Sequence, residues 1–378
     1  MCVVRVRTKE RIRRNAWQRY CWRFATVLFL GLAVALYAIL STVAGPGPRI
    51  KDSDPVVTER TATLRPLSLA ADKGAHDDLT EWWYYTGHLS GSSGERYGFH
   101  ATLFLRGGVV RHTVLHFSLM DLASGKRVER AMRTAGVPTG ESVQGFNFRQ
   151  ADWEISSEGT QHIVNVDAEG QKLALTMQER GTPMLHRAVG SRTPGILDFG
   201  EAGMSYYYSR PRLAAKGTVR DASGKTVEVE GDVWFDHQWG DFDSTLLGWN
   251  WFALQMDDGS DLMIYELFDK AARRVMLAGS LQSNGKVTPL AESDLELVPV
   301  GSWQSERSRV RYPAGWDVRT PFGVIQVRPE KAESEFNGLE TTFSYYWEGG
   351  VSVKGAKSGK GFLEMSGYDH IKALQPPK

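Results

Sequence analysis

The chain has 378 residues and carries 45 Lys and Arg against 44 Asp and Glu, which gives a formal net charge of +1. The basic excess lies in residues 1–23, which hold about +7, so about −6 remains for the rest of the chain. This distribution argues against a nucleic-acid-binding surface on the main body. The length allows two or three ordinary domains, and the many glycine and aromatic residues are typical of short strands joined by tight turns.

Residues 24–44 form an apolar run of 21 residues without a charge. The run is long enough to cross a bilayer as one transmembrane helix, and it exceeds the apolar core of ordinary secretory signal peptides. We therefore expect a retained signal anchor rather than a cleaved signal peptide. The basic tail 1–23 would stay cytoplasmic. This predicts a single-pass protein of the inner (plasma) membrane whose C-terminal body is extracytoplasmic, or periplasmic.

The body after the apolar run lacks cysteine, because Cys2 and Cys21 both precede it. It therefore has neither a disulfide nor a thiol nucleophile. Residues 45–75 contain few large apolar side chains, which predicts a linker between the membrane and the folded part.

Strand signals begin at residue 76. Segment 81–89 (EWWYYTGHL) predicts an extended strand in which Glu81 and Trp83 share one face, while Trp82 and Tyr84 share the other. A turn at 90–94 and an apolar return strand at 97–105 complete a hairpin. Further strand signals follow at 111–120, 145–148, 153–155, 162–166, 172–177, 206–208, 215–219, 227–235, 248–256 and 262–268. No long segment after the anchor keeps a 3.6-residue apolar period, so the sequence predicts an all-β protein.

Short motifs recur in the same order in the two halves of the body. Ser205-Tyr-Tyr, Lys216-Gly and Asp236-His237 are echoed by Ser344-Tyr-Tyr, Lys354-Gly and Asp369-His370. The aromatic strand around Trp83 is likewise echoed around Trp251, and we expect these two strands to hold the same topological position. The pattern indicates an internal duplication, with repeats at 76–243 and 246–375. Each repeat has the size of one antiparallel barrel or sandwich that can hold a ligand.

Segment 231–243 (GDVWFDHQWGDFD) places polar residues in an aromatic strand. Asp236, His237, Asp241 and Asp243 lie within eight positions, interleaved with Trp239 and Phe242. Acids and imidazoles buried among aromatic rings are costly unless paired, and their pKa values are often perturbed. We favour a segment that lines a functional pocket. The alternative is a structural corner in which Asp236 caps a turn and His237 is satisfied in the core.

Motifs spread over residues 76–373 carry a family resemblance; they are Glu81-Trp-Trp-Tyr84, Tyr208-Ser-Arg210, Trp234-Phe-Asp-His-Gln-Trp-Gly240, Gly248-Trp-Asn-Trp251 and Tyr346-Trp-Glu-Gly349. With them the chain resembles the AttH-like family, which is related to carotenoid 1,2-hydratase (hydroxyneurosporene synthase). The resemblance implies two tandem lipocalin-like antiparallel β-barrels. In the hydratase branch it implies addition of water to a terminal isoprenoid double bond without an organic cofactor. Many members are named only as predicted secreted hydrolases, often near genes for exporter-type membrane proteins.

Hydration of an isolated alkene requires a strong acid, a site that stabilises the tertiary cation, and a water molecule. A carboxylic acid kept protonated by an apolar pocket can serve as the acid. Faces of Trp and Tyr can stabilise the cation by ~2 kcal/mol or more when desolvated. We assign Asp236 as the acid, His237 as its orienting partner or the base for water, and Trp239 as a wall facing the cation. Tyr265 and Glu266 complete the predicted catalytic set.

The candidate ligand-binding residues are Glu81, Trp82, Trp83, Tyr84, Tyr208, Arg210, Trp234, Trp249 and Trp251. We expect the predicted catalytic set and Glu81 to border one apolar cavity at or near the contact between the repeats. Successive residues of a strand face opposite ways, so Asp236 and His237 reach the same pocket only if the strand bends, which Gly240 permits.

Other chemistries lack their motifs. The sequence contains neither G-x-S-x-G nor H-E-x-x-H, so it predicts no hydrolase serine elbow, no metal site and no cofactor. Two classes of function remain. The first is a membrane-tethered hydratase or hydrolase for an apolar isoprenoid- or lipid-like ligand. The alternative is a non-catalytic lipocalin-like carrier that hands a lipid to an exporter-type membrane protein.

Overall fold

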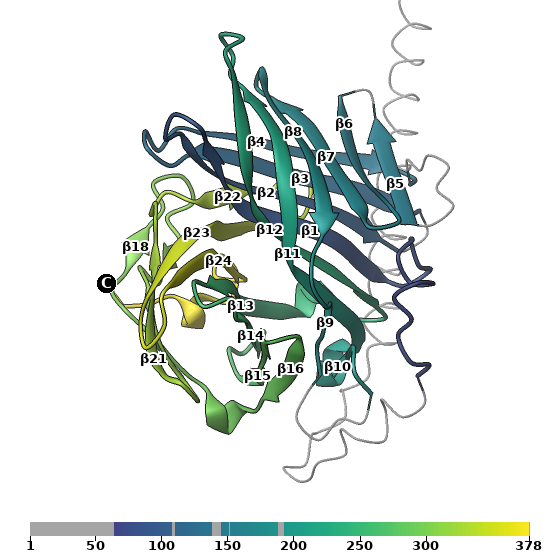
Figure 1. Cartoon of the computed structure of the whole chain (residues 1–378). Coiled ribbons are helices and arrows are strands. Elements are labelled where there is room, and N and C mark those ends of the chain that lie inside the picture. The colour runs from purple at the N-terminus through teal and green to yellow at the C-terminus, as the bar shows by residue number, and fades with distance from the viewer. Residues whose placement is uncertain (1–63, 108–109, 138–144, 151, 188–192, 378) are drawn as a thin grey trace, which may run out of the picture. The chain divides into compact units, whose positions relative to one another are not determined.

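The computed structural model describes residues 64–107, 110–137, 145–150, 152–187 and 193–377, which form two curled antiparallel sheets (Figure 1). The all-β prediction is confirmed. The apolar run 24–44, on which the anchor prediction depends, lies outside these residues. Within the described ranges, no helix has both the length and the apolar composition needed to span a membrane.

The first sheet has the strand order β4-β3-β2-β1-β12-β11-β8-β7-β6-β5, with β9 and β10 paired to β11. Its strands are β1 (Thr80–Gly91), β2 (Arg96–Arg106), β3 (His112–Asp121), β4 (Arg127–Ala135), β5 (Gly145–Gln150), β6 (Trp153–Glu158), β7 (Gln161–Ala168), β8 (Gln171–Glu179), β9 (Met184–Leu185), β10 (Ile196–Asp198), β11 (Met204–Arg220) and β12 (Thr226–Gly240). Strand β1 pairs with β2 on one side and with β12 on the other. The motif-rich strands therefore lie at the centre of the sheet.

The second sheet has the order β16-β15-β14-β13-β24-β23-β21-β20-β17, with β22 paired to β23. Its strands are β13 (Leu247–Met256), β14 (Asp261–Asp269), β15 (Arg274–Ser283), β16 (Lys286–Leu290), β17 (Glu296–Pro299), β20 (Trp316–Thr320), β21 (Gly323–Pro329), β22 (Glu335–Asn337), β23 (Tyr345–Gly355) and β24 (Gly359–Ser366). A separate two-stranded ladder joins β18 (Trp303–Gln304) to β19 (Arg311–Tyr312). Short 3₁₀ turns are η2 (Gly200–Ala202), η3 (Ser244–Leu246), η4 (Glu292–Asp294) and η5 (Lys372–Leu374). In both sheets the two outermost strands of the order are not paired with each other within the described residues, so each sheet is a curled half-barrel by its strand pairing.

Strands β1 and β13 hold equivalent positions, because each is the first strand of its sheet and lies between the second strand and the last. This confirms the predicted equivalence of the strands that contain Trp83 and Trp251. The sequence correspondence of Asp236-His237 with Asp369-His370 is not matched in the structure. Asp236 lies inside β12, whereas Asp369 follows the end of β24 at Ser366. The boundaries of the two predicted domains stay predictions, since all described residues belong to one compact unit, 56–378.

Alternation along β1 and β12 gives the first sheet two buried faces. Trp83 and Phe235 belong to a core made only of first-sheet residues. Tyr84 belongs to a different core, which also contains Trp251 and Tyr265 of the second sheet. A large apolar side chain contributes roughly 1.5–3 kcal/mol when fully buried, so this shared core stabilises the contact between the sheets. The candidate site lies within that contact.

Candidate active site

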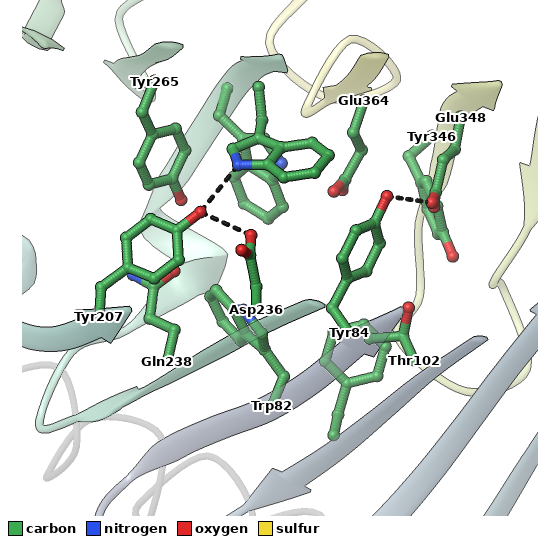
Figure 2. Close-up of a pocket in the computed structure, with 13 residues that line it drawn as sticks. Trp82, Tyr84, Thr102, Tyr207, Asp236, Gln238, Tyr265, Tyr346, Glu348 and Glu364 are labelled. Atoms are coloured by element: carbon green, nitrogen blue, oxygen red, sulfur yellow. Dashed lines mark hydrogen bonds between the residues drawn. The ribbon is translucent and has the colours of Figure 1, made fainter. Parts of the chain in front are cut away.

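A cavity of about 40 Å³, taken as the volume open to the centre of a water molecule, lies between the two sheets (Figure 2). Strands β1, β2, β11 and β12 form one wall, and β13, β14, β23 and β24 form the other. The lining residues are Trp82, Tyr84, Thr102, Phe104, Tyr207, Asp236, Gln238, Trp249, Trp251, Tyr265, Tyr346, Glu348 and Glu364. Trp82, Phe104, Trp249 and Glu364 keep partial solvent exposure, whereas the others are buried, so these four mark the open side.

Asp236 is the acid that the first sheet contributes to this cavity. Its carboxyl accepts hydrogen bonds from the Tyr207 hydroxyl over 2.6 Å, from Trp234 Nε1 over 2.7 Å and from the Ser209 hydroxyl. Trp251 Nε1 in turn donates to the Tyr207 hydroxyl over 2.8 Å. Burial raises the pKa of Asp236 to about 7, although the three donors act in the opposite direction. Near neutral pH the carboxyl therefore populates both forms and can give or take a proton.

A second hydrogen-bonded chain joins Asp236 to the other sheet through His186. Its Nε2 lies 2.7 Å from Ser209 Oγ, and its Nδ1 lies 3.0 Å from Ser280 Oγ. Burial lowers the pKa of His186 to about 3, so the ring is neutral at ordinary pH. Because Ser209 gives its only hydroxyl proton to Asp236, Nε2 of His186 must donate to Ser209. The chain therefore holds the Ser209 hydroxyl in the orientation that stabilises the Asp236 carboxylate.

The second sheet contributes a pair of acids. Glu348 and Glu364 are direct partners on β23 and β24, and Figure 2 shows both carboxyl groups at the cavity. Oε1 of Glu348 accepts a hydrogen bond from the Tyr84 hydroxyl over 2.5 Å and lies 3.3 Å from Nδ1 of His100. Burial, followed by repulsion from Glu364, raises the pKa of Glu348, and burial also raises the pKa of Glu364. Two adjacent carboxylates in a low-dielectric site cannot both ionise readily, so the pair keeps at least one proton near neutral pH.

Aromatic rings form most of the remaining wall: Trp82, Tyr84, Phe104, Trp249, Trp251, Tyr265 and Tyr346. The Tyr84 and Trp251 rings meet edge to face across the sheets, with centroids 5.1 Å apart. The Tyr346 hydroxyl lies 2.9 Å from Nδ1 of His116, which fixes that ring from behind. Aromatic faces attract cations, most strongly where water is excluded. The cavity thus combines protonated carboxyl groups with a surface that can stabilise a developing cation.

The structure brings together part of the sequence-predicted set. Of the predicted catalytic residues, Asp236 and Tyr265 line the cavity. Of the predicted ligand-binding residues, Trp82, Tyr84, Trp249 and Trp251 line it, and Trp234 contacts it through its hydrogen bond to Asp236.

Five other predicted site residues, on β12 and its neighbouring strands, lie on the opposite face of the sheet. Strand β12 stays in register with β1, so that Tyr84 opposes Asp236 and Trp83 opposes His237. His237 and Trp239 therefore face the core of the first sheet, together with Glu81, Trp83 and Tyr208. The expectation that they border the same cavity as Asp236 does not hold. The pairing of β12 with β1 is unbroken up to Gly240, and the pairing with β11 is regular from Phe235 to Trp239, so the alternation is preserved.

Two further predicted site residues form ion pairs away from the cavity. Glu266 accepts a hydrogen bond from Asn250 Nδ2 over 2.9 Å and lies 2.7 Å from Arg274. Arg210 lies 2.9 Å from Glu179 on the first sheet. Both side chains are satisfied by neighbours within their own sheet, so neither is free to act at the cavity.

The structural-corner alternative fits only one acid of segment 231–243. Asp243 caps η3 by accepting a hydrogen bond from the backbone N–H of Thr245 over 3.0 Å. Asp236 lies inside β12 and caps no turn. His237 is fully buried, and its Nε2 lies 2.9 Å from Glu81 Oε1.

Sequence reasoning missed the acids of the second sheet. Glu348 lies inside the quoted motif Tyr346-Trp-Glu-Gly349, and Glu364 interrupts an apolar strand, so both gave a local signal. Tyr207 and Ser209 lie inside the quoted motifs Ser205-Tyr-Tyr and Tyr208-Ser-Arg210, but only the pairing of β11 with β12 places them beside Asp236. His186 lies just after the two-residue strand β9 and has no surrounding pattern.

Comparison with known proteins assigns the chain to a protein family. A family model described as AttH-like matches residues 60–368. Kievitone hydratase from Fusarium solani subsp. phaseoli is 20% identical over 302 residues, which covers 77% of this chain and 81% of that protein. A solved structure from Nitrosomonas europaea, assigned to AttH, has a TM-score of 0.72 at 25% identity. The match covers 84% of this chain and 99% of that chain. Kievitone hydratase from Nectria haematococca shares the fold, with a TM-score of 0.66 at 17% identity and coverage of 82% of this chain and 96% of that chain. Because the family model spans most of the sequence, including both sheets, the chain belongs to the AttH-like family.

Proposed function

We propose that the chain is a hydratase that adds water to a carbon–carbon double bond at the apolar, isoprenoid-like end of its substrate. The observation that carries this proposal is the convergence of Asp236, Glu348 and Glu364 on one aromatic-lined cavity between the sheets. Such acids have no structural need to meet there, and an apolar pocket with a protonated carboxyl is what alkene hydration requires. The hydratase activity named for the Fusarium relative supports the same class of reaction.

The Glu348–Glu364 pair is the proposed acid. Its retained proton passes to the less substituted alkene carbon, where the π electrons form the new C–H bond and leave a tertiary cation on the neighbouring, more substituted carbon. The rings of Trp251, Tyr84 and Tyr265 surround this position and stabilise the cation. Because most of the cavity is buried, little bulk water competes for these interactions.

Asp236 is the proposed base. Its three hydrogen-bond donors favour the carboxylate, which can accept a proton from the attacking water as the new C–O bond forms. The net change is the addition of one water molecule. The protons then redistribute through Glu364, which reaches the open side. Sequence reasoning assigned Asp236 as the acid, and the donors around it support the opposite role.

The size of the cavity favours catalysis over transport. A volume of about 40 Å³ has room for a few water molecules, whereas a lipid carrier must enclose most of its ligand. Only the reacting end of a hydratase substrate has to reach Asp236, with the rest lying toward Trp82 and Trp249. The lipid carrier and its exporter partner stay predictions from the sequence.

The test uses the full-length chain with two probes, kievitone and a phenol bearing a single dimethylallyl group, incubated in D₂O. The expected product is heavier by one D₂O, with one deuterium bound to the carbon next to the new tertiary alcohol. Mass spectrometry and NMR check both features. Absence of this product from both probes would count against hydration of a dimethylallyl group.

The acid pair has its own test in substitutions that keep side-chain shape. Glu348→Gln and Glu364→Gln should each lower turnover at least ~100-fold, about 3 kcal/mol of barrier. The matched control is Glu335→Gln, which removes a buried carboxyl bonded to Tyr312 over 3.0 Å outside the cavity. That change should cost stability but leave turnover per folded molecule unchanged. Full turnover in a folded Glu364→Gln protein would remove this acid from the mechanism.

A further inference from the structure

Three side chains of metal-ligand type meet on the face of β1 and β12 opposite to the cavity. Nδ1 of His76 lies 2.7 Å from Oε1 of Glu81, and Nε2 of His237 lies 2.9 Å from the same oxygen. One donor atom from each residue falls within 4.8 Å of the other two. Glu81 and His237 are buried at 1% and 0% exposure, while the His76 side chain is 15% exposed. The cluster is therefore enclosed but can be reached from solvent past His76.

We propose that His76, Glu81 and His237 bind one divalent transition-metal ion of the zinc class. Two imidazole nitrogens and one carboxylate oxygen are ligands that Zn²⁺ accepts, and sites with three protein ligands leave a fourth position open. With metal–ligand distances of ~2.1 Å, donor atoms of a tetrahedral site are about 3.4 Å apart. The observed separations from Glu81 are slightly shorter, so a small outward movement of the two rings makes room for the ion.

The surroundings position the ligands as a metal site requires. Nε2 of His76, the nitrogen that points away from Glu81, lies 3.6 Å from Asp72, whose carboxylate is held by Arg65 over 2.6 Å. Carboxylates commonly orient metal-binding imidazoles in this way. Trp239 stacks on the His76 ring with centroids 4.3 Å apart and planes at 3°, which limits its rotation.

His237 is held in place by the rings around it, so its Nε2 is fixed toward Glu81. Its ring is stacked against Trp83, with centroids 4.6 Å apart, and Nδ1 has no hydrogen-bond partner among the described residues. Metal bonding at Nε2 would leave Nδ1 protonated and unpaired, so the proposed ion rests on the geometry of the three ligand atoms and not on this nitrogen.

Metal binding at this place would secure the chain before β1 to the centre of the first sheet. His76 precedes β1, Glu81 lies on β1 and His237 lies on β12. The ion would be held on the back of the strand that carries Asp236 and would not touch the substrate. The inference is therefore independent of the proposed hydratase activity.

The test measures metal content of the full-length chain rather than turnover. The purified protein is stripped with a chelator, equilibrated with Zn²⁺, passed through a desalting column and analysed by inductively coupled plasma mass spectrometry. We expect about one zinc per chain, and a melting temperature that rises by several degrees at ~100-fold excess over Kd. His76→Gln should abolish both effects and still fold, because this side chain is partly exposed and precedes the strand.

His370→Gln is the matched control, because it removes an exposed imidazole beside Asp369 and should leave zinc binding unchanged. His237→Gln gives an independent second variant. Failure of the wild-type chain to retain zinc would show that the three residues form only a hydrogen-bonded cluster, and would overturn the proposal. Equal zinc retention by wild type and His76→Gln would place the metal elsewhere and overturn it equally.

Discussion

At the scale of single residues, the protonation of Asp236 depends on the groups that donate to it. Tyr207 is the donor whose own hydroxyl is fixed by Trp251, so it can supply its proton only to Asp236. This arrangement favours the carboxylate, while burial favours the neutral acid and raises the pKa of Asp236 to about 7. A substitution of Tyr207 therefore alters the equilibrium between the neutral and ionised forms of Asp236 without removing the carboxyl group.

Tyr207→Phe should move the acidic limb of the kcat/KM profile to higher pH. Loss of a donor raises the pKa of Asp236 further, and a base must be ionised to act, so activity appears only at higher pH. The expected shift is on the order of one pH unit. Tyr208→Phe is the control, because the neighbouring side chain faces the core of the first sheet. If the acidic limb of the Tyr207→Phe profile stays at the wild-type pH, Asp236 is not the group whose ionisation controls kcat/KM.

At the scale of elements, the alternation of strands separates two groups of residues that are adjacent in sequence. Asp236 and His237 are consecutive, yet one lines the cavity and the other lies in the core of the first sheet. The pairing of β12 with β1 maintains this separation. Close backbone approach between these two strands occurs at Gly231, where an added Cβ would lie 2.1 Å from the carbonyl oxygen of His88.

Gly231→Ala should lower the free energy of unfolding by about 2 kcal/mol or more, because the backbone of β1 would have to move away. Urea denaturation measures this change. Gly98→Ala in β2 is the matched control, since its Cβ would meet only side-chain atoms at 3.6 Å or beyond. The control should change stability by less than about 0.5 kcal/mol. Equal stabilities of the two variants would contradict the close pairing of β1 with β12.

Sequence patterns predicted the features that depend on neighbouring residues. Strands, turns and the equivalence of the strands around Trp83 and Trp251 follow from alternation and turn residues, which are local. The site depends on pairings between distant segments. Tyr84 and Glu348, for example, are 264 residues apart in the chain and share a hydrogen bond. The sequence pattern indicated that acids lie among aromatic rings. Which of these acids line the same cavity depends on the register of both sheets.

At the scale of the whole molecule, buried histidines of the first half connect the two sheets. His100 lies beside Glu348, and His116 contacts both Tyr346 and Thr341 of the second half. Burial lowers the pKa of His116 to about 3. In the unfolded chain its pKa is about 6.5. The neutral ring therefore contributes stability that is fully present above pH 6.5 and is lost as the pH falls toward 3, because the unfolded state binds the proton first.

His116→Gln should reduce this sensitivity to acid. Between pH 6 and pH 4, wild type should lose roughly 2 kcal/mol of unfolding free energy relative to the variant, in addition to losses that both proteins share. Urea denaturation at several pH values measures the difference. Parallel pH dependences of wild type and His116→Gln would show that this imidazole is not held neutral between the sheets.

The narrow cavity has a kinetic consequence. A space of about 40 Å³ is small, so a substrate end larger than a few water molecules can enter only if side chains at the open side, such as Trp82 and Trp249, move. Association is then paced by how often the molecule opens rather than by how often the partners collide. Release of the product requires the same side-chain movement. Opening that is slow relative to the chemical step would lengthen the residence time of a bound molecule and keep a reactive cation isolated from side reactions until water captures it.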